Sequence, residues 1–367
     1  LFATIYMRTW YRMMGAKIGA DSEISTNISG RYDIVEIGDK CFIADEVILG
    51  DEDIRGGWMH LEKVVTGSRV FVGNDAVVAP GTIIPDGALI GVKSKPPSND
   101  QMSANDTWFG SPPIKLPVRQ KMDAGGAAWT YSPPWWKIWM RGTFEAVNIS
   151  LPTMLFITFG TWAVEVFGQR LLDGQYGVVT LLYMMCSVLI SLGMTLGVIG
   201  IKWGTMGRYE PQVKPMWSFW AMRTEAVAVL YWGLAGKVFL DHLRGTPFLP
   251  WMLRLFGSKF GKGVFMDSTD ITEFDCVNVG DFAVVNMMCV LQTHLYEDRV
   301  MKIGRIDVAK GVTVGAGSTV LYDTHCGEYA RIGPLTVVMK GETIPGHTEW
   351  IGAPAEPQIA SKAEAAR

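Results

Sequence analysis

The sequence predicts a mainly β protein in which two tandem β-solenoids flank a transmembrane helical hairpin. Three observations lead to this prediction. Residues 72–91 place an aliphatic side chain at every sixth position, a period that neither an α-helix nor a single strand has. The same repeat returns 242 residues later, over residues 314–333. Between the two repeats lie two long stretches without a charged residue.

The first repeat has its aliphatic positions at Val72, Val78, Ile84 and Ile90. A small residue follows four positions after each of the first three, and turn-forming residues fill much of the remainder. We therefore expect each six-residue step to form a short strand and a corner, with the aliphatic side chain inside the core.

The second repeat indicates a tandem duplication. Its core positions are Val308, Val314, Val320, Cys326, Ile332 and Val338. One offset of 242 residues aligns both repeats without a gap and matches Gly73 with Gly315 and Trp108 with Trp350. Each copy has roughly a hundred residues, which is a usual domain size.

The stretches 147–164 and 177–201 contain no charged residue. Crossing a hydrocarbon core takes roughly 20 apolar residues, so we predict a transmembrane hairpin over residues 147–201. The alternative is a buried helical hairpin of a soluble domain. Basic residues concentrate on both outer flanks of the hairpin, at Lys137 and Lys202 among others. Positive flanks stay in the cytoplasm, so both solenoids are expected on the cytoplasmic side.

The predicted organisation has seven parts. They are a membrane-proximal lead-in (1–14), the first solenoid (15–118), a linker (119–146), the hairpin (147–201), interfacial helices (202–256), the second solenoid (257–360) and a tail (361–367). The interfacial helices are expected because tryptophan and basic residues alternate on an apolar background there. The lead-in matches residues 243–256, so we expect another membrane segment, and a third solenoid before it, upstream in the natural protein.

Composition excludes some classes of partner. A net charge of −3 and a pI near 6.0 give no electrostatic basis for nucleic-acid binding. The five cysteines are an odd number without a CxxC pair, which indicates reduced thiols in a cytosolic compartment. The sequence shows no cluster of metal ligands. A mean hydropathy of +0.18 with 14 tryptophans indicates contact with lipid.

His294 is the candidate catalytic base. It lies in an insertion, residues 292–299, and Glu297 and Asp298 follow it closely. A neutral imidazole oriented by a carboxylate can deprotonate an attacking amine or hydroxyl at pH 7. The alternative is a loop histidine that makes a structural hydrogen bond. The first copy has Glu52 at the matching position, which suggests one competent site and one degenerate copy.

Other residues are candidates for binding substrate. They are Trp58, His60, Asn286, Lys302, Arg305 and His325. Trp58 and His60 lie in the predicted loop 50–64, which could form the opposing wall of a cleft. Lys302 and Arg305 would give a cationic wall for a phosphate-bearing ligand, although isolated basic residues on a solenoid are usually solvated. For His325 a structural role is the simpler interpretation.

Several motifs resemble those of hexapeptide-repeat acyltransferases. They are the period of six, the openings Gly15-Ala-Lys-Ile-Gly and Gly257-Ser-Lys-Phe-Gly, and the closing Gly352-Ala-Pro-Ala. The order of solenoid, hairpin and solenoid, with THLYEDRVMK (293–302) and TWFGSPPIKLPVRQ (107–120), looks more particularly like one group. This is the C-terminal region of membrane-bound, single-module non-ribosomal peptide synthetase-like proteins of the epsilon-poly-lysine synthetase type.

The resemblance implies left-handed parallel β-helices, with equivalent residues about eighteen positions apart in successive coils. It implies aminoacyl transfer from a phosphopantetheine thioester, or from coenzyme A, to an amine-bearing small substrate at a bacterial inner membrane. Carrier and adenylation domains of the same or a partner chain would be partners, and neighbouring solenoids could form an intramolecular pseudo-trimer. The alternatives are a coenzyme A-dependent O- or N-acetyltransferase and a non-catalytic membrane scaffold of a synthetase.

Overall fold

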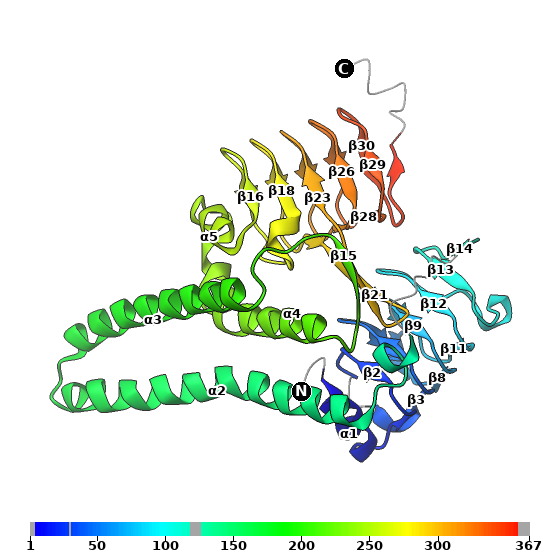
Figure 1. Cartoon of the computed structure of the whole chain (residues 1–367), viewed down its shortest axis with the longest axis horizontal. Coiled ribbons are helices and arrows are strands. Elements are labelled where there is room, and N and C mark those ends of the chain that lie inside the picture. Colours follow the sequence, from blue (N-terminus) through cyan, green and yellow to red (C-terminus); the bar gives the residue numbers. More distant parts are fainter. Residues whose placement is uncertain (1–3, 29–30, 118–125, 359–367) are drawn as a thin grey trace.

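The computed structural model describes residues 4–28, 31–117 and 126–358. Two stacks of short strands lie beside each other, and a long helical hairpin projects away from them (Figure 1). The first stack runs from blue to cyan and the second from yellow to red. The predicted tail, 361–367, lies outside the described residues.

The first solenoid has its parallel strands in three sheets. One sheet contains β1 (Lys17–Ile18), β3 (Val35–Ile37), β8 (Val64–Thr66) and β11 (Ile83–Ile84). The second sheet contains β2 (Glu23–Ile24), β4 (Phe42–Ile43), β9 (Phe71–Val72), β12 (Leu89–Ile90) and β13 (Thr107–Phe109), with β14 (Ile114–Leu116) antiparallel at its edge. The third sheet contains β5 (Ile48–Leu49) and β10 (Val77–Val78). Ile90 pairs with Val72, eighteen residues earlier. All four aliphatic positions of the first repeat are fully buried, as predicted.

The second solenoid repeats this arrangement. One sheet contains β16 (Lys259–Phe260), β18 (Val277–Val279), β23 (Ile306–Val308), β26 (Thr324–Cys326) and β29 (Thr343–Ile344). The second sheet contains β17 (Phe265–Met266), β19 (Val284–Val285), β24 (Thr313–Val314), β27 (Arg331–Ile332), β30 (Glu349–Ile351) and β31 (Glu356–Pro357). The third sheet contains β20 (Val290–Gln292), β25 (Thr319–Leu321) and β28 (Val337–Val338). Val320 pairs with Val338, again eighteen residues apart. Val314, Val320 and Ile332 are buried in the core, as predicted.

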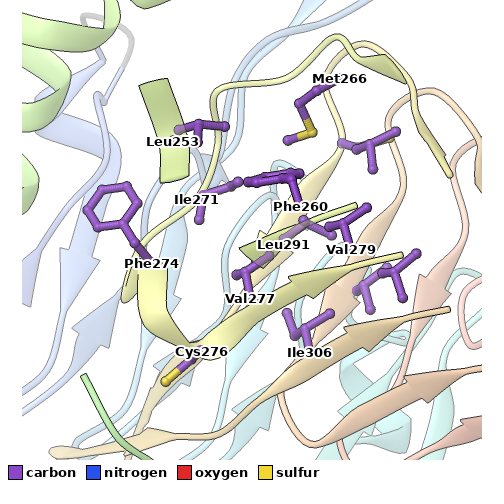
Figure 2. Packing of buried hydrophobic residues seen from close by; sticks show 14 of the residues in the cluster. Leu253, Phe260, Met266, Ile271, Phe274, Cys276, Val277, Val279, Leu291 and Ile306 are labelled. Atoms are coloured by element: carbon purple, nitrogen blue, oxygen red, sulfur yellow. The ribbon is translucent and has the colours of Figure 1, made fainter. Parts of the chain in front are cut away.

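A short helix covers the first coil of each solenoid. The helices are α1 (Ile5–Met13) and α5 (Phe248–Phe256). Leu253 of α5 packs on Phe260, Ile271 and Phe274 of the second solenoid, and Figure 2 shows this end of the core. Such a cap removes the first coil's apolar interior from water, as terminal units of solenoids must.

The hairpin consists of α2 (Trp135–Leu172) and α3 (Tyr176–Thr205). Both helices are long and apolar enough to cross a membrane, by length and composition. The predicted linker, 119–146, is wrong in part because α2 already begins at Trp135. No proline or glycine interrupts residues 135–141, and Lys137 and Arg141 are buried against the rest of the protein. The helix therefore extends beyond its apolar stretch.

Residues 202–256 are largely helical. They contain α4 (Phe219–Leu230), which continues into a π-helical turn, η4 (Tyr231–Gly236), and then η5 (Leu240–Leu243) and α5. Tyr231 and Leu234 belong to the hydrophobic core of the second solenoid. The segment also supplies a strand, β15 (Gln212–Pro215), which the sequence did not predict.

Candidate active site

A β-hairpin from the second solenoid reaches across to the first. It consists of β21 (His294–Glu297) and β22 (Val300–Ile303), and β15 extends it to three antiparallel strands. The ring of Tyr296 stacks on Phe42 of the first solenoid at 5.7 Å between centroids. At the turn, buried Arg299 donates to the carbonyl oxygen of Cys41 (2.8 Å) and pairs with Glu23 (3.3 Å). These contacts fix the two solenoids on either side of the hairpin.

His294 is paired with a buried carboxylate at the start of this hairpin. Its Nδ1 lies 2.7 Å from Oε2 of Glu273, whose side chain is 2 % exposed. Glu273 directly precedes η6 (Phe274–Cys276). It also accepts hydrogen bonds from the hydroxyls of Thr293 (2.7 Å) and Thr224 (3.2 Å). Three contacts to one carboxylate leave it little freedom to move, so it can orient the imidazole.

The pairing determines which nitrogen of His294 can act as a base. Among the residues that the structure describes, every hydrogen-bond partner of the ring, including the hydroxyl of Thr272 at 3.2 Å, is at Nδ1. A proton on Nδ1 donated to Glu273 leaves the lone pair on Nε2. Nε2 is therefore the nitrogen available to a substrate proton.

Electrostatics strengthen this base. Burial by itself lowers the pKa of His294, but the neighbouring Glu273 carboxylate outweighs it, so the pKa is raised above its ordinary value. Burial likewise raises the pKa of Glu273, and the charge of His294 with the Thr293 hydroxyl more than reverses this. The net effect on Glu273 is a lowered pKa, so it stays ionised beside the imidazole.

The predicted orienting carboxylates, Glu297 and Asp298, are not the ones that contact His294. Side chains alternate along a strand, so Glu297, three residues on, faces away from it. Glu297 instead pairs with Lys302 and Lys340, each at 2.7 Å. Asp298 lies at the hairpin turn and accepts from the hydroxyl of Tyr131 (3.5 Å). Sequence proximity was the wrong criterion for this partner.

Most predicted substrate-binding residues lie elsewhere. Lys302 is buried in its pair with Glu297. Arg305 and His325 are exposed on the second solenoid, and the Asn286 amide donates to the carbonyl of Val314 at 2.8 Å. The predicted loop 50–64 contains a hairpin of its own, β6 (Asp53–Arg55) and β7 (Trp58–His60). Trp58 is 82 % exposed and His60 contacts Glu62 at 3.2 Å, so neither residue has a described contact with His294.

The groups around His294 are acidic. Glu225 of α4 accepts from the hydroxyl of Tyr296 at 2.8 Å, and the Tyr296 ring lies edge-on to the imidazole. Asp45 interacts electrostatically with His294, and Asp270 with Asp45. Asp45 is exposed at the surface, but the protein packed around these carboxylates disfavours their charged forms and raises the pKa of Asp45 and of Asp270 to about 7 each.

The opposite face of β21 lines a cavity between the two solenoids, with a volume of about 110 Å³. Its walls are mainly apolar and come from both domains: Phe71, Leu89, Val92, Phe109, Leu116, Leu295, Leu321 and Met339, with Glu297 and Lys340 as charged members. Thr107 also lines it, and its buried hydroxyl has no hydrogen-bond partner among the described residues. Within the described ranges, no group of three or more metal-ligating side chains is placed to bind a metal ion.

No family model matches the chain. A curated protein does: delta-poly-L-ornithine synthetase of Acinetobacter baumannii (strain AB307-0294) is 45 % identical over 363 residues. The match covers 98 % of this chain and 27 % of that protein. The chain is homologous to part of a poly-amino-acid synthetase. This confirms the resemblance to single-module synthetase-like proteins, and the relative's name agrees with the prediction of an enzyme. The chain spans about a quarter of that relative's length.

Solved structures give weaker likenesses. A hexapeptide-repeat acetyltransferase from Vibrio cholerae is 14 % identical with a TM-score of 0.26, over 34 % of this chain and 85 % of that one. Serine acetyltransferase from Neisseria gonorrhoeae is 18 % identical with a TM-score of 0.24, over 46 % and 65 %. Scores this low support no conclusion about this chain.

Proposed function

We propose that the chain is the amide-forming transferase part of a synthetase, joining an activated amino acid to an amine. The observation that carries this proposal is the His294–Glu273 pair, with Nε2 of His294 left open between two solenoids. The homologous synthetase, by its name, makes a polymer of an amino acid. A base that activates an amine is what such a condensation requires.

The reaction would proceed by direct transfer. The amine first releases its ammonium proton to water and enters with its neutral nitrogen near Nε2 of His294, which accepts a second proton as the nitrogen attacks the thioester carbonyl. A C–N bond forms and the C–S bond breaks. The departing thiolate then receives the proton from the imidazolium, which the ionised Glu273 stabilises until that moment. The solenoids contribute by holding both substrates in the geometry of attack.

The acidic groups near His294 support a cationic amine as the acceptor. Asp45 and Glu225 interact with the base, and Asp270 interacts with Asp45, Glu46 and Asp75. Opposite charge raises the local concentration of a cationic substrate. The word ornithine in the relative's name supports a basic amino acid, and delta supports reaction at its side-chain amine.

We propose that the cavity on the other face of β21 holds the stem of a pantetheine donor, whose thioester end passes the edge of this strand to reach Nε2 of His294. Its apolar walls suit an extended flexible arm, and Lys340 supplies a positive charge. We propose that a phosphopantetheine-bearing carrier domain, loaded by an adenylation domain, is the partner that presents this arm. Coenzyme A is the second candidate, because it ends in the same pantetheine group.

The membrane assignment is part of the same proposal. Both domains would be left-handed β-helices that arose by tandem duplication, on the cytoplasmic side of a bacterial inner membrane, with α2 and α3 crossing it. The apolar side chains of Ile54, Trp58 and Met59 on the first hairpin are exposed. We propose that a further solenoid of the longer natural protein packs there, as the second hairpin packs on the first solenoid.

The test is His294→Ala in the full-length natural protein, assayed for amide formation from a loaded carrier domain. Loss of a positioned general base should lower transfer by about 100- to 10,000-fold. His347→Ala is the matched control, because His347 stacks on Tyr329 at an exposed turn. Transfer unchanged by His294→Ala would favour the scaffold interpretation. Equal rates with acetyl-coenzyme A as donor would favour an acetyltransferase.

A further inference from the structure

The helical hairpin carries three buried cations at the end nearest the solenoids, and two of them, Arg141 and Lys202, pair with carboxylates outside the hairpin. Arg141 of α2 is 1 % exposed, and Lys202 in the last turns of α3 is fully buried. A buried charge is costly unless it is paired. Both side chains are paired, and partners of each lie outside the hairpin. The pairs therefore fix the position of the hairpin relative to the solenoids.

Arg141 connects the hairpin to the strand that carries His294. It contacts Glu23 of β2 in the first solenoid at 2.8 Å and Glu225 of α4 at 3.4 Å. Glu225 accepts a hydrogen bond from the hydroxyl of Tyr296 at 2.8 Å, and the centroid of the Tyr296 ring lies 5.6 Å from that of the His294 imidazole. Since guanidinium has planar donors in fixed directions, it holds these carboxylates in a defined arrangement.

Lys202 reaches the turn that follows Glu273, the carboxylate partner of His294. Its Nζ lies 2.6 Å from Oδ2 of Asp275, which also accepts the backbone N–H of Tyr209 at 3.1 Å. Asp275 is two residues after Glu273 and lies in η6, the 3-10 turn that Glu273 directly precedes. The lysine thus anchors the turn that positions the orienting carboxylate.

We propose that Arg141 and Lys202 are positioning residues of the active site, and that the hairpin assembles the site as well as anchoring it. Through Arg141 the hairpin holds Glu225 and Tyr296 on one side of His294. Through Lys202 it holds Glu273 on the other side. This inference rests on the proposed role of His294 as the base.

The electrostatics of Glu225 give this proposal a distinctive readout. Burial outweighs the charge of Arg141, so the pKa of Glu225 is raised to about 7 even with the arginine in place. Ionised Glu225 in turn raises the pKa of His294, together with Glu273 and Asp45. Without Arg141, the pKa of Glu225 rises further, so Glu225 is ionised less and supports the imidazolium less. The pKa of His294 then falls, and the acid limb of the pH–rate profile moves to lower pH.

The experiment uses Arg141→Met in the full-length protein in membranes, with amide formation measured against pH. A misplaced base should reduce kcat by about 10- to 100-fold, and the acid limb should shift downward. Arg141→Lys keeps the positive charge. The acid limb of its pH–rate profile should therefore stay at the wild-type pH, and kcat should be partly retained. The control is Arg170→Met, an exposed arginine at the far end of the same helix. Lys202→Met should lower kcat by roughly tenfold through displacement of the turn.

A second variant keeps the test decisive if Arg141→Met does not fold. Glu225→Gln retains an oxygen that accepts from the Tyr296 hydroxyl but removes the charge, so the acid limb should still move downward. The proposal would be overturned if Glu225→Gln, and any Arg141→Met protein that folds, kept the wild-type kcat and an unshifted acid limb of the pH–rate profile. If His294→Ala itself keeps full activity, the proposed function fails instead, and the two failures are distinguishable.

Discussion

The two solenoids use one structural position for different chemistry. In the second, Glu273 and His294 form the carboxylate–imidazole pair. The residues 242 positions earlier are Arg31 and Glu52, and these two also contact each other, as an ion pair. The 3-10 turns that hold the pairs, η1 (Tyr32–Ile34) and η6, are equivalent as well. The fold supplies the juxtaposition, and the residue types alone decide whether it can transfer a proton.

The two hairpins extend this comparison. Asp53 pairs with His60 across the first hairpin, and the equivalent residues Leu295 and Lys302 pair across the second. The second hairpin packs on a neighbouring solenoid, whereas the first exposes its apolar side chains. Its turn also differs, since Gly57 stands where the second has Arg299, the residue that contacts Glu23. The two β-hairpins therefore share a backbone arrangement but differ in what surrounds them.

Among the variants that test the difference between the two pairs, Glu273→Gln has the largest expected effect. The amide keeps a hydrogen bond to His294 but removes the charge that raises the pKa of that histidine. Burial then lowers this pKa, so the acid limb of the pH–rate profile should move to lower pH, with kcat reduced by roughly tenfold to a hundredfold. A pH–rate series on the full-length protein measures both. An unmoved limb would contradict the assignment of Glu273 as the orienting carboxylate.

A smaller effect, on stability, tests the unequal environments of the hairpins. Met301 and Met59 occupy equivalent positions, but Met301 is 1 % exposed and Met59 is 58 % exposed. Met301→Ala should lower the free energy of unfolding by about 2–5 kcal/mol, as core truncations do. Met59→Ala should change it by less than about 0.5 kcal/mol. Thermal unfolding of both variants gives the comparison, and similar losses would show that the first hairpin is also packed in the folded chain.

The sequence predicted the solenoids well because their signal is repeated locally. A single aliphatic residue in each coil, such as Val72 or Val320, defines both the period and the core. His294 was also found locally, since it stands in an insertion. Its partner Glu273 could not be found this way, because the contact joins residues of two different coils. The offset of 242 residues contains the missing signal, since it aligns Glu273 with Arg31 and His294 with Glu52.

The network around Arg141 was harder to predict for a different reason. Its members, such as Glu23, Glu225 and Arg299, come from the first solenoid, α4 and the second hairpin. They meet only because the first turns of α2 pack against both Glu23 and Glu225, and no local period of the sequence records that packing. From the sequence alone, Arg141 is one of the basic residues that flank the predicted membrane segment.

The Glu52→Gln variant has the smallest expected effect. A different result would contradict the conclusion that the Glu273–His294 and Arg31–Glu52 pairs differ in function. Glu52 matches His294, but its partner Arg31 is a cation that cannot accept a proton, and both side chains are partly exposed. Loss of a partly exposed ion pair should cost less than about 1 kcal/mol, and amide formation should stay at the wild-type rate. The assay is the one used for His294→Ala, with thermal unfolding as the control for folding. A large loss of transfer in a folded Glu52→Gln protein would mean that the first pair also takes part in the reaction, so that the two copies would share the work of one site.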